Sequence, residues 1–575
     1  MLLATVVADV KTLAKRFDYL VPDHLRDQVR VGTLVRVQLG SRRVGGWVVA
    51  LTEQSDAPPG RTLKPIAKAT GWGPPDELVA LADWAAWRWA GHPAHFLGTA
   101  SPDSAVVGLP AAPRRAVVPV ALDGIGATAL AADRAVVRLP PARDPYDVVL
   151  AAVARGNALV VTPSVATARL IAVRLKRAGV PVASYPRDWA LGRAGATVVG
   201  ARAAAWAPVG GLAAVVVVDE HDEGLREEGA PTWHARDVAI ERARRAGVPC
   251  VLTSPVPSLE ALGWGRLFTL SRSEERAGWP PLLVVDRRRD DPARPGLLSD
   301  ALARAIRATT GTCICVLNRI GTARLLRCGA CAEVARCERC AGSVVGADDG
   351  VVCERCGVRR PAVCLACGAA RFRNVRPGVA RLRTELEALL GEPVAEVTGA
   401  HAAGDGWPEA RVVIGTEAAL HRVPSASLVA VLDLDAELLA PRFRAEEQAL
   451  ALLARAARVV GGRDGGGRLL VQTREPHHEV IRAVLQADPG RLAEVEGARR
   501  RTLRLPPEAA LALVRGPGSP AAIEPLRALP GIEVAPAGEE RWLVRAGDAA
   551  QLADALSRRA HPVATVRVEV DPVRA

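Results

Sequence analysis

The sequence has very few lysines and no long apolar run. Only five of its 75 basic residues are lysine, so arginine supplies nearly all of the positive charge. No uninterrupted apolar run reaches the roughly 18 residues that a membrane-spanning helix needs, so we expect no membrane partner. A secretory signal peptide requires a basic residue ahead of its apolar run, and the opening MLLATVVADVK has none. The sequence therefore predicts a cytoplasmic protein whose first residues form a strand.

The sequence also lacks a loop that could cradle phosphates. Such a loop has the pattern G-x-x-x-x-G-K-[ST], in which glycine amides and a lysine hold the phosphates and a hydroxyl holds Mg²⁺. None of the five lysines follows a glycine, and the corresponding position reads VVRLPPARDPYDVV, where three prolines remove amide donors. We find no convincing Ser-His-Asp, G-x-S-x-G or H-E-x-x-H arrangement either. Bound ATP and Mg²⁺ are therefore not expected.

The charge that is present is positive overall. Lys and Arg number 75 against 62 Asp and Glu, which gives a net charge of +13 and favours a polyanionic partner such as nucleic acid. The excess is nearly all arginine, in a chain rich in Ala and Gly, and this composition is also typical of a GC-rich coding bias. The alternative to a nucleic-acid partner is therefore a basic surface that is only solvated.

Hydrophobic patterns divide the 575 residues into several domains. The first segment alternates apolar and polar residues, as β-strands do, and the next is rich in Pro, Ala and Gly, as linkers are. Two further segments alternate short apolar runs with helical patterns, which predicts parallel sheets covered by helices. We expect a multidomain α/β fold that begins with a β-rich domain (1–100) and a linker (101–135). Two lobes follow (136–285 and 286–505), with a cysteine-rich module (326–370) inside the second, and a small α+β domain (506–575) ends the chain.

Eight cysteines stand as four C-x-x-C pairs within about forty residues. A two-residue gap lets a tight turn aim two thiolates at one metal, and two such pairs complete a tetrahedral structural zinc site. The alternative is a set of disulfides or scattered core thiols. Because Cys331 and Cys337 are separated by only five residues, whereas twelve residues separate Cys340 from Cys353, we predict two nested zinc sites. The outer site has Cys328, Cys331, Cys364 and Cys367, and the inner site has Cys337, Cys340, Cys353 and Cys356.

Two carboxylates follow an apolar strand in AAVVVVDEHD. Asp219 and Glu220 stand where a motor protein would hold Mg²⁺ and orient a water molecule. Without a phosphate loop, the interpretation that we favour is a vestigial pair left from an ancestral site.

These segments together resemble the PriA family of replication-restart helicases. The resemblance rests on VVVVDEHDEGLREEGAPTWHARDVAIERARRAGVPCVLTSPVPSLEA, on LNRIGTARLLRCGAC with the four cysteine pairs, on VLDLDAELLAPRFRAEEQALALL, and on RFDYLVP with VGTLVRVQLGSRRVGGWVV near the N-terminus. It implies two RecA-like lobes, two structural zinc ions nested as above, and an N-terminal domain that binds the 3′ end of a DNA strand. It also implies a pocket for that terminal nucleotide, lined by Phe17, Asp18, Tyr19, Gly40 and Lys64. The alternative for Phe17 and Tyr19 is the core, because they alternate on a strand.

The sequence departs from the family wherever ATP would act. The family's GSGKT loop is missing, its DEEH is shortened to Asp219-Glu220-His221, and its arginine-bearing QVAGRAGR has become ARAARVVGG. The segment 101–135 is too short for the winged-helix domain that the family usually carries. The resemblance is therefore to a degenerate branch that keeps the zinc ligands and has lost the motor.

The resemblance implies a nucleoid-associated replication-restart protein that binds forked and single-stranded DNA and is not an enzyme. Its expected partners are other primosome proteins, the replicative helicase or its loader, and the single-strand binding protein. Two alternatives stay open: an active ATP-dependent 3′ to 5′ DNA helicase with a divergent nucleotide site, and a zinc-stabilised adaptor that no longer touches DNA.

Overall fold

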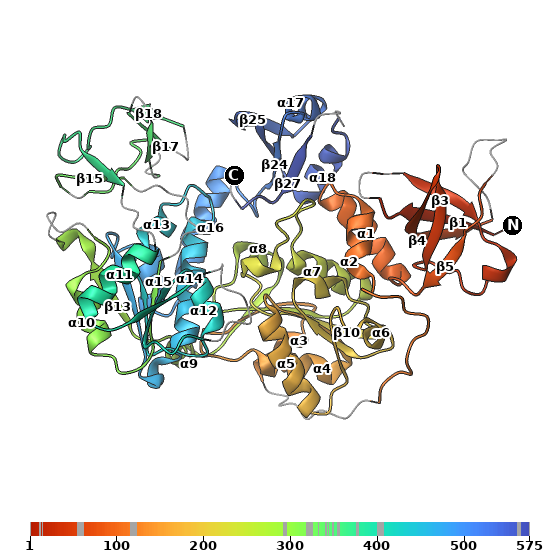
Figure 1. Cartoon of the computed structure of the whole chain (residues 1–575), viewed down its shortest axis with the longest axis horizontal. Helices are drawn as coiled ribbons and strands as arrows, with labels where there is room; N and C mark the ends of the chain where they lie inside the picture. The colour runs from red at the N-terminus through yellow and green to blue at the C-terminus, as the bar shows by residue number, and fades with distance from the viewer. Residues whose placement is uncertain are drawn as a thin grey trace. The chain divides into compact units, whose positions relative to one another are not determined.

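The computed structural model describes all residues except 1, 11, 12, 14, 54–62, 115–123, 291–295, 318–325, 332, 340, 341, 343, 348, 349, 354–356, 375–378, 399–406, 561–564, 574 and 575. The chain divides into two compact units, and many of their elements are labelled in Figure 1. The first unit comprises Met1–Arg138, Pro145–Thr269 and Arg500–Pro572. The second comprises Leu139–Asp144, Leu270–Arg499 and Val573–Ala575.

The first unit begins with an antiparallel sheet of five strands in the order β2-β1-β4-β3-β5. Alternation along the strands sends Val6, Val37 and Val48 into one apolar core. The strands are β1 (Leu3–Ala8), β2 (Arg16–Leu20), β3 (Leu34–Leu39), β4 (Arg42–Thr52) and β5 (Lys68–Gly71), and the helices after them are α1 (Asp76–Arg88) and α2 (Pro93–Ala100).

A parallel sheet of seven strands follows, in the order β12-β6-β11-β10-β7-β9-β8. Its central strands are continuous apolar runs because helices cover the sheet. The strands are β6 (Arg134–Arg138), β7 (Asn157–Val161), β8 (Val182–Ser184), β9 (Thr197–Gly200), β10 (Leu212–Val217), β11 (Cys250–Ser254) and β12 (Arg266–Thr269). The helices are α3 (Ile125–Leu130), α4 (Tyr146–Arg155), α5 (Val165–Arg177), α6 (Trp189–Arg193), α7 (Ala235–Ala246) and α8 (Leu259–Trp264).

The second unit is built on another parallel sheet, in the order β13-β23-β22-β14-β21-β20. Its strands are β13 (Leu282–Asp286), β14 (Cys313–Val316), β20 (Val394–Val397), β21 (Val412–Gly415), β22 (Leu428–Val431) and β23 (Arg468–Thr473). Its helices are α9 (Arg272–Ala277), α10 (Asp300–Arg307), α11 (Val379–Leu390), α12 (Ala418–Arg422), α13 (Asp435–Leu438), α14 (Ala445–Val460), α15 (Glu479–Leu485) and α16 (Gly490–Leu503). The edge strand β13 pairs with β23, although it lies ahead of the boundary expected at 286.

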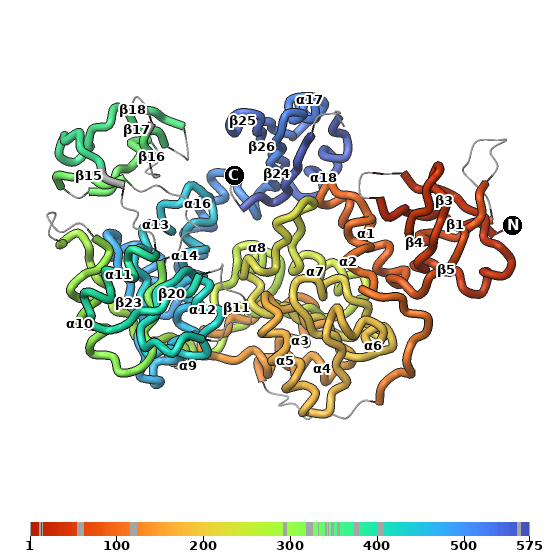
Figure 2. Tube along the Cα trace, in the orientation of Figure 1, coloured from red at the N-terminus to blue at the C-terminus, as the bar shows by residue number. Residues whose placement is uncertain are grey.

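The cysteine-rich module is inserted between β14 and α11, and Figure 2 lets its trace be followed. Strands β15 (Leu326–Cys328) and β19 (Phe372–Asn374) pair antiparallel with Leu326 opposite Asn374, so the chain enters and leaves the module side by side. Between them lies a three-stranded sheet of β16 (Val344–Ala347), β17 (Gly350–Cys353) and β18 (Arg359–Arg360).

The C-terminal segment forms an antiparallel sheet in the order β25-β26-β24-β27 and belongs to the first unit. Its elements are β24 (Ala510–Arg515), α17 (Ser519–Ile523), β25 (Glu533–Gly538), β26 (Arg541–Ala546), α18 (Ala549–Ser557) and β27 (Arg567–Val570). The buried Arg226 donates a hydrogen bond to the carbonyl of Val570 at 3.2 Å, which fastens β27 to the first parallel lobe. The multidomain α/β fold expected from the sequence is confirmed. Among the described residues, no helix has the length and apolar character needed to cross a membrane.

Candidate metal centre and DNA interface

Four cysteines of the module converge on one point. The Sγ atoms of the predicted outer site, Cys328, Cys331, Cys364 and Cys367, all lie within 4.8 Å of one another. The distance is 3.5 Å between Cys328 and Cys367 and 3.7 Å between Cys331 and Cys364. Four thiolates at about 2.3 Å from a tetrahedral zinc ion would stand roughly 3.8 Å apart, whereas a disulfide needs about 2 Å. The cluster therefore fits one metal ion.

Backbone amides prepare Cys328 for a metal. It ends strand β15, and the amide of Ala330 donates to its Sγ at 3.4 Å. Burial alone would raise the pKa of the Cys328 thiol, but the amides of Cys331 and Ala330 and the thiols of Cys367 and Cys331 lower it to about 7, while the pKa of the Cys331 thiol is raised. A thiol with a lowered pKa more readily becomes the thiolate that binds a metal.

The turn that carries Cys364 ends in a left-handed glycine. The amide of Gly368 donates to the carbonyl of Cys364 at 2.9 Å, and Gly368 has φ +75°. The turn at Cys353 is built alike, since Gly357 donates to the Cys353 carbonyl at 3.0 Å and has φ +72°. Glycine adopts this conformation without steric cost. Sequence reasoning missed both glycines, although the pattern C-x-x-C-G contains them.

The predicted inner site is only half described. Cys337 and Cys353 are buried, at 4% and 2% exposure, in the small core of the module. Their predicted companions Cys340 and Cys356 lie outside the described residues. The inner ligand set therefore stays a prediction.

Three of the residues predicted to hold a DNA 3′ end are linked by one glutamine. The hydroxyl of Tyr19 donates to the carbonyl of Gln38 at 3.1 Å. The carbonyl of Gly40 accepts hydrogen bonds from the Gln38 side chain at 3.1 Å and from Lys64 Nζ at 3.3 Å. Gly40 and Lys64 are exposed and Gly40 has φ +59°, so this turn presents a lysine and backbone atoms at the surface.

The other two residues lie on opposite faces of β2. Phe17 packs against the apolar core that includes Tyr19, whereas Asp18 accepts a hydrogen bond at 2.8 Å from Thr5 of the neighbouring strand. Because side chains alternate along a strand, Asp18 points to the other side of the sheet from Phe17 and Tyr19. The structure thus groups Tyr19, Gly40 and Lys64, and the role predicted for the five residues stays a prediction.

The carboxylate of Glu220 is fully engaged within the protein. It is 0% exposed, and its Oε1 accepts a hydrogen bond from the amide of Ser258 at 2.7 Å. Its Oε2 accepts from the Ser258 hydroxyl at 2.8 Å and from Arg236 Nη1 at 3.0 Å. Burial alone would lower the pKa of Arg236, but Asp237 and Glu220 hold it above its usual value. Glu220 and Arg236 thus form a buried ion pair at the end of β10, where a motor protein would have a catalytic carboxylate.

The residues beside Glu220 are also held by their neighbours. Asp219 is 5% exposed and has φ +52°, in the left-handed region that a non-glycine residue rarely adopts. Nδ1 of His221 lies 2.8 Å from Oγ of Ser254 at the end of β11. The backbone of Asp219 is therefore strained, and such strain is a common mark of a functional or formerly functional position.

The loop between β6 and α4 replaces the missing phosphate loop. Residues 139–144 belong to the second unit, and there the amide of Ala142 donates to the carbonyl of Gly278 at 3.1 Å. Pro140, Pro141 and Pro145 have no amide hydrogen. The amides that would form an anion nest are therefore absent or already used at these positions.

The arginines of ARAARVVGG lie in α14 and have partners in the second unit. Arg455 forms an ion pair with Glu417, and Arg458 donates to the carbonyl of Pro141 at 3.2 Å. Structural contacts thus engage both arginines of the segment that resembles the family's arginine motif.

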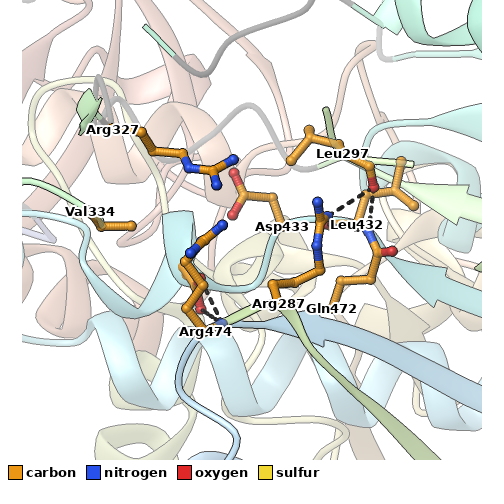
Figure 3. Close-up of a pocket in the computed structure, with 9 residues that line it drawn as sticks. Arg287, Leu297, Arg327, Val334, Leu432, Asp433, Gln472 and Arg474 are labelled. Atoms are coloured by element: carbon orange, nitrogen blue, oxygen red, sulfur yellow. Dashed lines mark hydrogen bonds between the residues drawn. The ribbon is translucent and has the colours of Figure 1, made fainter. Parts of the chain in front are cut away.

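Sequence reasoning missed a pocket in the second unit. Arg287, Asp433 and Arg474 line it from the ends of neighbouring strands, and Arg327 lines it from the module (Figure 3). Their spacing along the chain gives no local signal. The one available signal is that each of the first three follows an apolar strand closely.

Two parallel α/β lobes, with a cysteine-rich module in the second and an antiparallel domain before the first, define a multidomain protein of the helicase-like class. Residues 5–102 match the family model described as the 3′DNA-binding domain (3′BD) of PriA. Over 568 residues the chain is 31% identical to a replication restart protein PriA of Mycobacterium tuberculosis, covering 88% of this chain and 85% of that protein. The chain belongs to the replication restart protein PriA family, as the resemblance implied.

Other matches are more partial. The replication restart protein PriA of Bacillus subtilis is 30% identical over 349 residues, which cover 55% of this chain and 43% of that protein. A solved structure of Dbp5 from S. cerevisiae bound to RNA and ADP BeF3 matches with a TM-score of 0.38 and 14% identity, over 66% of this chain and 93% of that one. The latter similarity is too distant to bear on function. Family membership and the 3′BD assign the chain to DNA binding in replication restart.

Proposed function

We propose that this chain recognises stalled or repaired replication forks and directs loading of the replicative helicase without being a helicase itself. The observation that carries the proposal is the match of residues 5–102 to the 3′DNA-binding domain, within a chain that belongs to the PriA family. The net charge of +13 supports it, because contacts from arginine to phosphate supply most of the affinity of a fork binder.

The proposed partners follow from this role. The DNA partners are forks and single strands, and the protein partners are other primosome proteins, the replicative helicase or its loader, and the single-strand binding protein. Two structural zinc ions would fold the module. Closed sites of four thiolates leave no open coordination position, so the metal would act through the surface that it shapes.

The contacts at the former nucleotide site support the loss of helicase activity. Glu220 has three hydrogen-bond donors from Ser258 and Arg236, and so has little capacity left to orient a water molecule. The loop of residues 139–144 offers prolines and a used amide where phosphates would need free donors. These features favour a scaffold over the alternative, an active helicase with a divergent nucleotide site.

We expect the protein to prefer a fork with a free 3′ hydroxyl at its branch over the same fork with a 3′ phosphate. The preference should be several-fold and should shrink in a Lys64→Ala variant, because Lys64 stands beside the exposed Gly40 turn. Fluorescence anisotropy with labelled forks at several salt concentrations measures both effects, and the affinity itself should fall steeply with salt.

Lys68→Ala is the matched control, because Lys68 is an exposed lysine on β5 of the same domain. It should reduce overall affinity slightly and leave the preference between the two forks unchanged. Equal binding of both forks by the unmodified protein would leave a general basic DNA binder, and no binding at all would favour an adaptor that does not touch DNA.

We expect no DNA-stimulated ATP hydrolysis above background, and no change on Asp219→Asn. A coupled phosphate-release assay with forked DNA, run beside a known ATP-dependent helicase, provides the measurement. DNA-stimulated hydrolysis that Asp219→Asn abolishes would instead establish the active helicase with a divergent site.

A further inference from the structure

Helix α5 of the first parallel lobe has two apolar faces, and only one of them is packed. Its buried face, which includes Ile171 and Leu175, packs on strands β8 and β9. The opposite face also carries apolar side chains, although it points to solvent. Leu170 is 60% exposed and Val173 is 39% exposed. Figure 1 shows α5 beside α4 at the surface of the lobe.

The exposed side chains of α5 line up along the helix. Residues that are three or four positions apart lie one above another on a helix. At such intervals stands one stripe, which consists of Ala166, Leu170, Val173 and Arg177. Two more exposed residues, Arg169 and Lys176, flank the stripe on one side. These six residues together form the outer face of α5.

An aligned row of exposed apolar residues is unusual in this chain. A surface helix ordinarily buries its large apolar residues, as α10 does with Leu302 and Ile306. Three of the eleven large apolar residues that are exposed in the described part of the chain lie on α5. Single exposed apolar residues are normal, whereas a contiguous row with a polar rim marks a contact surface.

The charge of α5 is entirely positive. Its 13 residues include three arginines and one lysine, with no Asp or Glu. Arg174 lies over the ring of Tyr146 in α4, with 3.7 Å between its guanidinium carbon and the ring centroid, and so ties the two helices together. Arg169 and Arg177 have no hydrogen bond or ion pair from their side chains to any residue that the structure describes. Both guanidinium groups are therefore available to a partner.

The apolar stripe and the basic flank together select the kind of partner. Phosphates of DNA would meet the arginines but would leave Leu170 and Val173 uncovered, and the outer face has no aromatic ring on which a base could stack. A second copy of the chain would set the four cations of one α5 against the four of the other. A helix that has its own apolar stripe with flanking carboxylates complements both parts of the outer face.

We propose that the outer face of α5 docks an acidic amphipathic helix of a partner protein. The 13 residues of α5 span about 20 Å, enough for a partner helix of some three turns to lie along them. Because such a contact is small and partly ionic, we expect affinity in the micromolar range that weakens with salt. The inference goes beyond the proposed function, since α5 lies in the first parallel lobe and outside residues 5–102.

The test uses the full zinc-loaded protein and a fluorescein-labelled synthetic peptide of about 15 residues, with Leu at helical spacing and Glu on both sides. A scrambled peptide of the same composition is the control for charge alone. Fluorescence anisotropy should show the amphipathic peptide bound about tenfold more tightly than the scrambled one, because only the former presents an apolar stripe. Equal binding of the two peptides overturns the proposal.

Variants of the outer face locate the contact. Leu170→Ser should weaken binding of the amphipathic peptide about five- to tenfold, and Arg177→Gln about threefold with a shallower dependence on salt. The matched controls, Leu267→Ser on β12 and Arg304→Gln on α10, replace exposed residues elsewhere and should change neither quantity. The melting temperature should stay unchanged in all four variants, because the replaced side chains are exposed.

Two results with these variants overturn the proposal. One is peptide binding that neither Leu170→Ser nor Arg177→Gln weakens. The other is a loss confined to Arg177→Gln, which would reduce the outer face to a general basic surface.

Three further measurements distinguish other occupants of the outer face. If Leu170→Ser weakens binding of an oligothymidylate but not of the peptide, the outer face belongs to DNA. If it weakens only binding to phosphatidylglycerol vesicles, the face belongs to a membrane surface, and if it dissociates a dimer in sedimentation velocity, to a second copy of the chain. Each of these results rejects the acidic helix. Failure of the proposed function is distinct, because the unmodified protein would then bind no fork while peptide binding remained.

Discussion

Replacing Cys364 by serine is expected to release the metal ion proposed for the outer site and to unfold the module around it. The four outer thiols lie within 4.8 Å of one another and fit a closed tetrahedral site. Such a site contributes roughly 10 kcal/mol of apparent folding free energy. Among the described residues of the module, the core cluster contains five buried residues, two of which are cysteines, so little else holds it together. Metal analysis and limited proteolysis within residues 326–374 measure both effects.

Cys250→Ala provides the matched control. Cys250 lies in β11 of the first unit, and burial raises the pKa of its thiol, so it stays protonated and binds no metal. This variant should keep the metal content of the unmodified protein and an intact module. Unchanged metal content in Cys364→Ser would contradict the outer site, and a coloured iron centre would contradict the identity of the metal.

Replacing Glu220 by alanine is expected to lower the free energy of unfolding of the first unit by about 3–5 kcal/mol, as is usual when one partner of a buried ion pair is removed. The change leaves Nη1 of the buried Arg236 without the Glu220 carboxylate, although its Nε still pairs with Asp237, and it also leaves the Ser258 amide without an acceptor. Denaturant unfolding followed by tryptophan fluorescence measures the loss, with a fall in melting temperature of roughly 10 °C.

The double variant Glu220→Met, Arg236→Met removes this pair of charges together and leaves Asp237 without its partner Arg236. It should recover part of the lost stability, because well-packed apolar residues often replace a buried ion pair at little cost. A Glu220→Ala variant that is as stable as the unmodified protein but has lost ATP hydrolysis would contradict the structural role and make Glu220 a catalytic carboxylate.

The fold was predictable from sequence because its signals are local. Continuous apolar runs such as those of β10 and β11 indicate buried parallel strands, and alternation from Leu34 to Leu39 indicates the N-terminal sheet. The strand β13 shows the limit. Its residues indicate a strand, but an edge strand between two lobes can join either sheet, and only its pairing with β23 decides.

The candidate sites also differ in how far the sequence predicts them. The fixed spacing of the C-x-x-C pairs predicts the metal ligands, since each pair is a single turn. The contacts of Glu220 come from Arg236 and Ser258, which are 16 and 38 positions away, and no periodicity connects them. The pocket of Arg287, Arg327 and Arg474 is more distributed still, because a sheet and an inserted module must both form before these residues meet.

The pairing of β15 with β19 bears on how such a protein can change over evolution. Leu326 stands opposite Asn374, so the two ends of the whole insertion are neighbours on adjacent strands. A segment whose ends meet can be excised, exchanged or transplanted as a cassette, because a short bridge closes the host chain without displacing the sheet of the lobe. The module and the lobe can therefore diverge at different rates, as in a sequence that has four C-x-x-C pairs and no phosphate loop.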